Sequence, residues 1–435
     1  MEYLEHEKEE EDQPVSPTGQ YFNSSVLQIS IMSILELDIP IDDSPTLSLL
    51  KDVFLPINPR FSSLMVEDKN GVKHWKRVEV KLEDHVNVPI FPDGLSPESY
   101  DDYFDDYLTK IAMKEFPQSR PLWEIHIIKY PTSNAAGTVV SSNLDSGRSI
   151  IRAVPRALSA AFNTVSDFGW GLLKSTAVED NRTPIRSGDP GVEFRPLSIT
   201  TISFSLDNIQ KIKAKLGVTI NDVLTGIIFF GTRLYMQSMN HASRNANSTA
   251  LVLLNTRVIS GYKSLKEMTA SDSSSQWGNQ FAFLHVTLPE LADAKFTSPL
   301  DFVAKAQQTI QRKRNSLAVH LTGRLLETLR KYRGPEVTAR YIHGTLKNSS
   351  MTISNMIGPM EQVALANHPC RGMYFMTLGS PESMTISILS YMGKVRITVG
   401  TEKGFIDPRK FNACIEDAFQ RVFEAAVGTP PPPMS

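Results

Sequence analysis

Three short clusters of the sequence place polar side chains beside turn-forming residues, a combination that often surrounds a reaction site. They are Ser119-Arg-Pro-Leu-Trp-Glu124, Thr219-Ile-Asn-Asp-Val-Leu-Thr-Gly226 and Ile353-Ser-Asn-Met-Ile-Gly-Pro359. Each cluster also has a structural interpretation. A Pro-Leu-Trp turn can fasten a strand to a core, Asn221-Asp222 can begin a helix, and Ser354-Asn355 can form hydrogen bonds within a turn. Taken singly, each cluster favours the structural interpretation.

Histidine is the most common general base in proton transfer, and the nine histidines of this chain are spread out, with no two adjacent. His126 and His285 lie within apolar runs typical of strands, where a histidine is more often structural than catalytic. The sequence has no serine-hydrolase elbow, no Walker phosphate loop and no dinucleotide-binding glycine motif. It also lacks CxxC and HExxH spacing, so no metal site is expected.

In the first half of the chain, helical and strand patterns alternate. We expect a helix over residues 43–54, an amphipathic helix over 100–116 and a strand over 122–129. The core face of the first helix would consist of Leu47, Leu49, Leu50 and Val53. A further strand begins at Gly137 but is expected to stop at Val140, because residues 141–148 have the composition of a loop.

The second half has a more regular pattern of alternating elements. We expect strands over 197–206, 250–258 and 280–288, helices over 220–236, 300–314, 317–333, 335–347 and 411–426, and a hairpin around Met392-Gly393. This pattern predicts an α/β or α+β protein with two lobes. The expected divisions are an acidic disordered tail (1–18), an N-terminal lobe (19–177), a linker (178–194), a C-terminal lobe (195–428) and a Pro-rich tail (429–435).

Composition excludes several classes of protein. The 435 residues, 41% of them hydrophobic, suffice for two domains. The formal net charge is −2, so the chain lacks the excess of positive charge typical of nucleic-acid-binding proteins, and a nucleic-acid partner is disfavoured. Only Cys370 and Cys414 are present, which excludes a disulfide scaffold and favours a reducing compartment. The acidic N-terminus does not look like a signal peptide, and no apolar run is long enough for a membrane span, although attachment to a membrane surface stays open.

Together, and in this order, the three clusters resemble the wax ester synthase/diacylglycerol acyltransferase family of acyl-CoA-dependent O-acyltransferases, in particular its plant branch. The resemblance extends over most of the chain. It includes Glu11-Asp-Gln-Pro-Val-Ser-Pro17, Asn58-Pro-Arg-Phe-Ser62, Leu254-Asn-Thr-Arg257 and Trp277-Gly-Asn-Gln-Phe281. It implies two chloramphenicol-acetyltransferase-like lobes with a reaction channel between them. By the same resemblance, the substrate or channel residues are Pro121, Leu122, Trp123, Asn221, Asp222, Asn255, Arg257, Gly278, Asn279, Ser354, Asn355, Gly358 and Pro359.

The catalytic signature of that family, His-His-x-x-x-Asp-Gly, is missing. In the family, a neutral histidine accepts the proton of the acceptor hydroxyl as it attacks the acyl-CoA thioester. Here Gly137-Thr-Val-Val140 matches the approach, and Ser141-Ser142 follows where the signature should continue. About 30–40 residues are missing near 140/141, on the dimensions of a βαβ unit. We therefore assign no catalytic residue and expect an inactive or severely impaired acyltransferase, whose incomplete N-terminal lobe has an open sheet edge and exposed apolar surface.

Two alternatives stay open. The chain could be a non-catalytic protein that binds lipid or acyl-CoA, or pairs with a full-length relative. Alternatively, His126 or His285 could replace the missing base if its side chain faced the channel.

The resemblance also implies partners and a location. The expected substrates are long-chain acyl-CoA with a fatty alcohol or diacylglycerol, for wax ester or triacylglycerol biosynthesis, and no cofactor is expected. Association with other family members is a further expected interaction. The expected location is the cytosolic face of the endoplasmic reticulum membrane, or the plasma membrane, with peripheral attachment.

Overall fold

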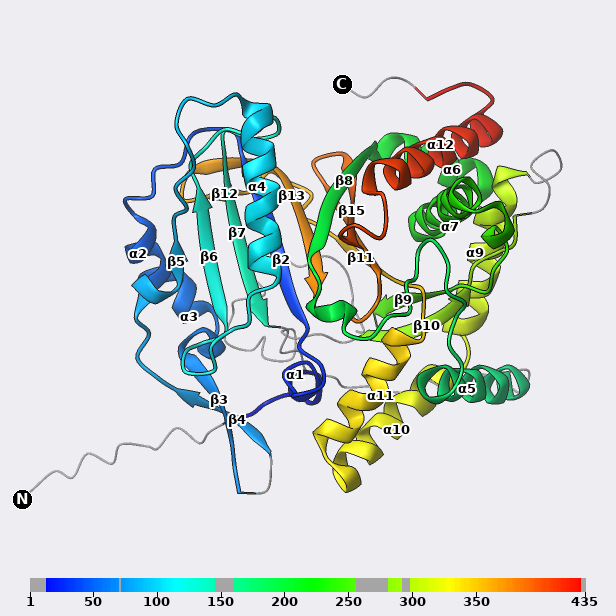
Figure 1. The fold of residues 1–435 in the computed structure, drawn as a ribbon, viewed down its shortest axis with the longest axis horizontal. Helices are drawn as coiled ribbons and strands as arrows, with labels where there is room; N and C mark the ends of the chain where they lie inside the picture. The colour runs from blue at the N-terminus through cyan, green and yellow to red at the C-terminus, as the bar shows by residue number, and fades with distance from the viewer. Residues whose placement is uncertain (1–12, 70–71, 145–159, 256–280, 292–297, 432–435) are drawn as a thin grey trace, which may run out of the picture.

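Two six-stranded β-sheets form the framework of the protein (Figure 1). The computed structural model describes residues 13–69, 72–144, 160–255, 281–291 and 298–431. Within these residues, helices pack against both sheets, and a small third sheet lies near the N-terminus. The expected α/β class with two lobes is confirmed. The domain boundaries stay predictions.

The first sheet has the strand order β12-β13-β2-β7-β6-β5. Its strands are β12 (Ala364–Leu365), β13 (His368–Leu378), β2 (Ser30–Leu37), β7 (Gly137–Leu144), β6 (Trp123–Ile128) and β5 (Val86–Asn87). β13 comes from late in the chain and pairs antiparallel with the whole of β2. No sequence pattern predicts β13, because Pro369 and Gly372 interrupt its apolar alternation. The ladder accommodates them with a bulge between Cys370 and Gly372.

The second sheet has the strand order β10-β9-β11-β14-β15-β8. Its strands are β10 (Phe281–Thr287), β9 (Thr249–Asn255), β11 (Met351–Ile357), β14 (Met384–Tyr391), β15 (Lys394–Glu402) and β8 (Leu197–Ser205). β11 runs parallel to both β9 and β14, while the other pairs are antiparallel. The expected hairpin of β14 and β15 is confirmed. Met392 and Gly393 turn it with φ of 49° and 71°, as a two-residue turn with the hand of the sheet twist requires.

The longer helices include those expected over 100–116, 220–236, 300–314, 317–333, 335–347 and 411–426, each within four residues at either end. They are α4 (Pro97–Ala112), α5 (Ala160–Thr176), α6 (Leu206–Leu216), α7 (Ile220–Met239), α9 (Pro299–Arg314), α10 (Ala318–Arg333), α11 (Pro335–Lys347) and α12 (Pro408–Val427). α4 covers one face of the first sheet, where Phe104 and Leu108 join Met32, Ile34 and Val140 in one core (Figure 1). Ser96 caps this helix by accepting a hydrogen bond from the amide of Ser99.

Helices cover the second sheet on both faces. α7, α9 and α12 lie over one face, where Leu284 and Val286 of β10 join the main core. On the other face, Leu251 of β9 and Phe283 of β10 join a smaller core with α1 (Pro17–Tyr21) and α11. Successive residues of β10 therefore face opposite helical layers, as the pleat of a strand dictates.

The expected end of the strand that begins at Gly137, now β7, is wrong. The strand does not stop at Val140 but continues through Ser141 and Ser142 to Leu144. Two neighbours explain this: β2 and β6 pair with β7 along its length and supply the hydrogen bonds that override a loop-like composition. β7 therefore lies inside the sheet and is not itself an edge strand.

The helix expected over 43–54 is only partly correct. α2 (Thr46–Leu49) is followed by a π-helical turn (Leu50–Phe54) and by α3 (Leu55–Ile57). Leu50 is buried, whereas Leu47, Leu49 and Val53 are exposed, so the expected core face is wrong. A π-helical turn departs from the 3.6-residue period on which that expectation rests.

Among the described residues, no single helix has the length and hydropathy needed to cross a membrane. α6 and α7 reach the required length and hydropathy only when the two helices are taken together, and they meet at an angle of 100°.

A buried ion pair ties α5 to the second half of the molecule. Lys174 of α5 contacts Asp180, and neither side chain is exposed. Asp180 also accepts hydrogen bonds from the amide of Thr249 (2.6 Å) and the hydroxyl of Ser350 (2.7 Å). The segment expected to be a linker is thus anchored to the starts of β9 and β11.

Breaking this pair should destabilise the fold. We expect Lys174→Met to lower the free energy of unfolding by about 3–5 kcal/mol, because it leaves the Asp180 carboxylate buried without its counter-ion. The double variant Lys174→Met/Asp180→Leu should recover part of the loss. Urea denaturation measures both. As a control, Arg421→Met breaks an exposed ion pair with Asp417 and should change stability by less than about 1 kcal/mol. An equally small effect of Lys174→Met would contradict the anchoring role.

Candidate functional site

The second and third sequence clusters meet at one edge of the second sheet. Asn355, near the end of β11, donates a hydrogen bond from Nδ2 to Oδ1 of Asn221 at the start of α7 (3.1 Å). The parallel strands β9 and β11 both end at this edge, so the backbone of Asn255 also lies there. The carboxyl edge of parallel strands is where α/β proteins commonly bind ligands. Two side-chain amides offer donors and acceptors without charge, which suits neutral polar groups such as an amide or ester.

Asp222, the neighbour of Asn221, caps the helix. Its carboxylate accepts hydrogen bonds from the amide (2.9 Å) and hydroxyl (2.8 Å) of Thr219, and its own amide donates to that hydroxyl (3.2 Å). This reciprocal arrangement is a capping box. The structural interpretation of Asp222 is therefore correct, and its effect on the site is to fix where Asn221 stands.

The end of the third cluster requires close backbone contact. The amide of Gly358 donates to the carbonyl of Ser390 (3.0 Å), and a Cβ at this glycine would lie 2.3 Å from that oxygen. A side chain is therefore excluded at Gly358. Around it, the apolar side chains of Met356, Ile357 and Met360 are largely exposed.

The first cluster anchors a strand. The Trp123 ring stacks on His85, with centroids 4.1 Å apart, and its Nε1 donates to the carbonyl of Phe61 (2.9 Å). Phe61 belongs to the Asn58–Ser62 motif, so two of the motifs that carry the family resemblance are in contact. Pro121 and Leu122 are buried beside them, and the carbonyl of Leu122 accepts a bond from the amide of Leu144 at the end of β7. The cluster therefore holds the strand end that the catalytic signature would follow.

His126 is unsuited to replace the missing base. It faces α4, where Nδ1 lies 2.9 Å from the hydroxyl of Tyr107 and Nε2 lies 3.4 Å from a carboxylate oxygen of Glu124. Glu124 also contacts Lys114 (2.8 Å) and Arg120. Burial alone would raise the pKa of Glu124, but the bonds with His126 and Lys114 and the two cations together lower it to about 2. His126 thus belongs to a buried charge cluster between the first sheet and α4.

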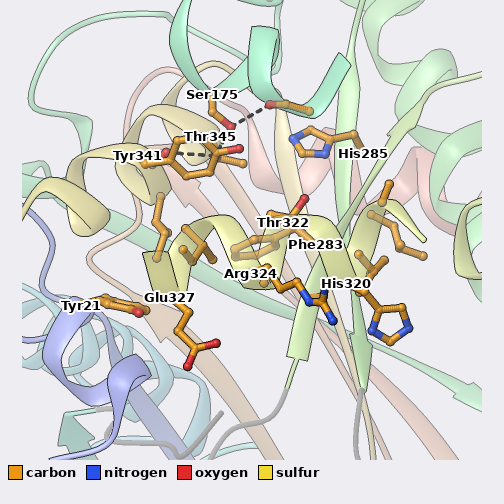
Figure 2. Close-up of a pocket in the computed structure, with 18 of the residues that line it drawn as sticks. Tyr21, Ser175, Phe283, His285, His320, Thr322, Arg324, Glu327, Tyr341 and Thr345 are labelled. Atoms are coloured by element: carbon orange, nitrogen blue, oxygen red, sulfur yellow. Dashed lines mark hydrogen bonds between the residues drawn. The ribbon is translucent and has the colours of Figure 1, made fainter. Parts of the chain in front are cut away.

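His285 faces a cavity. The cavity has a volume of about 460 Å³ and lies between α1, α5, β10, α10 and α11. Figure 2 shows the imidazole pointing toward Ser175 and Thr345, with Tyr21 and Glu327 farther along the lining. Burial, reinforced by the nearby Lys313 and Lys174, lowers the pKa of His285 to about 4, so the ring is neutral at pH 7. No sequence motif indicates this cavity, although the strand pattern of β10 places His285 on one of two faces.

The structure thus brings Asn221, Asn355, Gly358 and the backbone of Asn255 to one sheet edge. Ser354 lies beside them on β11, and Pro121, Leu122 and Trp123 anchor β6 in the other sheet. Arg257, Gly278 and Asn279 lie outside the described residues. Within the described ranges, no group of three His, Cys, Asp or Glu side chains could hold a metal ion.

Trp123 offers a test of the anchoring role. Trp123→Phe keeps a ring against His85 but leaves the Phe61 carbonyl without its donor, so we expect a loss of about 1–2 kcal/mol in the free energy of unfolding. Trp123→Ala removes the ring and should cost about 3–5 kcal/mol. Urea denaturation gives both values. Tyr332→Phe, at an exposed ring, serves as the control and should stay within about 0.5 kcal/mol.

Glu124 should make the stability of the fold depend on pH in the acidic range. Its pKa is lower in the folded protein than the ordinary value of 4.5, so its stabilising contribution is present above that pH and is lost as the pH falls toward 2. Glu124→Gln should flatten the stability profile in this window and reduce stability at pH 7, where Lys114 and Arg120 lose their partner. Denaturation between pH 2.5 and 7 measures the profile. Exposed Glu424→Gln is the control, and an unchanged slope in Glu124→Gln would count against the charge cluster.

Comparison with known proteins agrees with these features. A family model, the WS/DGAT C-terminal domain, matches residues 277–422. Wax ester synthase/diacylglycerol acyltransferase 8 of Arabidopsis thaliana is 30% identical, over 95% of this chain and 96% of its own length. Wax ester synthase/diacylglycerol acyltransferase 4 of the same plant is 28% identical, over 98% of this chain and 92% of its own.

Solved structures support the fold. The wax ester synthase/diacylglycerol acyltransferase from Marinobacter aquaeolei VT8 has a TM-score of 0.59 at 14% identity, over 96% of this chain and all of that one. The cyclization-docking bidomain of EpoB from Sorangium cellulosum has a TM-score of 0.58 at 9% identity, over 97% of this chain and 85% of that one. The extent of the match to the Arabidopsis proteins shows more than a shared fold: this chain belongs to the wax ester synthase/diacylglycerol acyltransferase family.

Proposed function

We propose that this chain retains the substrate-binding framework of an acyl-CoA-dependent O-acyltransferase but transfers acyl groups slowly or not at all. Its family consists of acyltransferases, so the chain is an acyltransferase by descent. The proposed substrates are long-chain acyl-CoA and a fatty alcohol or diacylglycerol. The proposal depends on one observation: β7 runs to Leu144 without a histidine, and the sequence contains no His-His pair.

The missing histidine pair matters because an alcohol is a weak nucleophile. Its hydroxyl must lose a proton as the oxygen attacks the thioester carbon, and a positioned base contributes typically ~10²–10⁴-fold to such a step. The structure supports this proposal by the placement of the two candidate replacements. His126 is enclosed by Glu124 and Tyr107. His285 lies near Lys313 and Lys174, which oppose the imidazolium that a base must become.

The length of the family alignments also supports a deletion. The match to wax ester synthase/diacylglycerol acyltransferase 4 extends over 488 positions, more than the 435 residues of this chain. That relative therefore has residues without a counterpart here. We place at least part of the difference after β7, where the signature should continue.

The proposed location is the cytosolic face of the endoplasmic reticulum membrane or the plasma membrane, with peripheral attachment. One observation supports it: the apolar side chains of Met356, Ile357 and Met360 are exposed. The pathway served would be wax ester or triacylglycerol synthesis. Imaging of the tagged full chain with organelle markers tests the location, and a diffuse cytosolic signal would contradict it.

Acyl transfer can be measured directly. The purified full chain is incubated with labelled palmitoyl-CoA and either hexadecanol or a diacylglycerol, in parallel with wax ester synthase/diacylglycerol acyltransferase 8. We expect turnover about 10²–10⁴-fold below that of the relative, because the base is missing, together with measurable acyl-CoA binding. Turnover equal to that of the relative would refute the impairment.

A chimera that carries a segment of the relative tests the same proposal by gain of function. Replacing residues 141–150 with the longer corresponding segment of that relative should restore turnover if the framework is intact. A folded chimera that binds acyl-CoA and stays inactive would show that more than this segment has been lost.

The second candidate function is a non-catalytic partner that binds lipid or acyl-CoA, or pairs with a full-length family member. The retained Asn221–Asn355 contact favours it, since this edge persists without the catalytic segment. Co-purification with a full-length relative supports pairing. Failure to bind either acyl-CoA or a relative removes this candidate.

A further inference from the structure

The outer face of α10 carries apolar side chains that the rest of the protein leaves exposed. Leu317, at the N-cap, Leu321 and Tyr332 have exposed fractions of 37%, 37% and 72%. Their spacing of four and eleven residues places them on one side of the helix, and they are called here the α10 stripe. The opposite side packs inward through Val319 and Leu326. α10 lies at the lower rim of the molecule in Figure 1, beside α11 and α5.

Apolar side chains on both faces distinguish α10 from an ordinary surface helix. α12 shows the usual arrangement: Phe411, Ile415 and Phe419 are buried, and none of the large exposed apolar side chains belongs to this helix. A helix that packs on one side normally has polar residues on the other. An apolar stripe on the solvent side of α10 therefore indicates contact with a second apolar environment.

Positive charge is concentrated around the α10 stripe. Residues 312–333 contain seven lysines or arginines and one acidic residue, Glu327, which is an excess of six positive charges in a chain with a net charge of −2. Asp167 of α5 offsets part of this excess, because it pairs with Lys313 and Arg312. Four further cationic residues in this range are exposed: Arg314, Arg324, Lys331 and Arg333.

The cations and the apolar side chains occur together at the end of the helix. Lys331 and Arg333 flank Tyr332, and the Lys331 ammonium lies 5.5 Å from the centre of the Tyr332 ring. Leucine and tyrosine side chains can enter the boundary between lipid head groups and acyl chains. Lysine and arginine have flexible stems, which let their charges stay beside the head-group phosphates. This combination matches an anionic lipid surface in both charge and polarity.

We propose that the α10 stripe and its flanking cations bind peripherally to a membrane surface that contains anionic lipids. The proposal rests on the peripheral attachment proposed above and deepens it, because it names the face of the protein and the class of lipid. It requires no acyl transfer, since α10 contains none of the residues that carry the family motifs.

Flotation with vesicles measures the lipid preference of the full chain without acyl-CoA or alcohol. One set of vesicles consists of phosphatidylcholine, and the other of equimolar phosphatidylcholine and phosphatidylserine. We expect at least tenfold tighter binding to the anionic vesicles, and a loss of that preference as NaCl is raised, because salt screens the attraction. Equal binding to both sets, or no binding to either, would overturn the proposal.

Reversing the two charges beside Tyr332 tests the cations. Lys331→Glu/Arg333→Glu should weaken binding to the anionic vesicles at least tenfold. Lys213→Glu/Lys215→Glu is the matched control, because these lysines are also exposed, have the same spacing and lie in the last turn of their helix, α6. Urea denaturation checks that both variants are folded. Unchanged binding by the folded α10 variant, or an equal loss in the α6 variant, would refute a role for these cations.

The apolar part of the surface has its own test. Leu321→Gln/Tyr332→Gln should weaken binding to anionic vesicles about tenfold, because less apolar area enters the interface. Ile90→Gln/Met239→Gln changes two exposed apolar residues elsewhere and should have no effect. Light scattering without vesicles tests a second copy of the chain as the occupant. A dimer that the α10 variant dissociates and the control does not would overturn the membrane proposal in favour of self-association.

These measurements separate this proposal from the proposed location. A chain that is bound to membranes in cells, but binds vesicles independently of α10, contradicts only the α10 surface. A diffuse signal in cells, with α10-dependent binding to anionic vesicles, contradicts only the location.

Discussion

The antiparallel pairing of β13 with β2 is the contact on which the shape of the molecule depends. It puts residues 368–378 into a sheet whose other main strands come from the first third of the chain. Arg396 of β15 reinforces the junction through its ion pair with Glu36 of β2 (2.7 Å). A Cβ at Gly372 would lie 2.1 Å from the same carboxylate, so a side chain there would displace Glu36. The two sheets are therefore one framework, and the edge that carries Asn221 and Asn355 is fixed relative to β7.

The deletion proposed after β7 is compatible with this framework. The hydrogen bonds of β7 are made to β2 and β6, and its buried residues join the core beneath α4. The proposed missing segment would follow β7 and is not needed for these contacts. Stability and chemistry therefore reside in different parts of the chain, which is the general relation between a fold and a site built on it.

The sequence predicted most long elements because their patterns are local. The helices α9, α10 and α11 follow their apolar period, and the turn of the β14–β15 hairpin follows from Met392-Gly393. Sequence patterns did not predict the elements whose structure depends on pairing with distant parts of the chain. β7 extends past Val140 because two neighbouring strands bond to it, and β13 is a strand because β2 lies beside it. Family resemblance indicated Asn221 and Asn355 separately, whereas their contact spans 134 residues and could come only from the fold.

His126 and His285, the two candidates to replace the missing base, both lie in surroundings that do not suit a general base. A general base has to become positively charged during the reaction, so its surroundings must tolerate that charge. His126 meets Glu124, but that carboxylate is already shared with Lys114 and Arg120, and Tyr107 closes the other side of the ring. His285 has an unpaired nitrogen and open space beside it, yet Lys313 and Lys174 lie near and their charges oppose protonation. An imidazole that its surroundings hold neutral can donate or accept a hydrogen bond, but it is a poor general base.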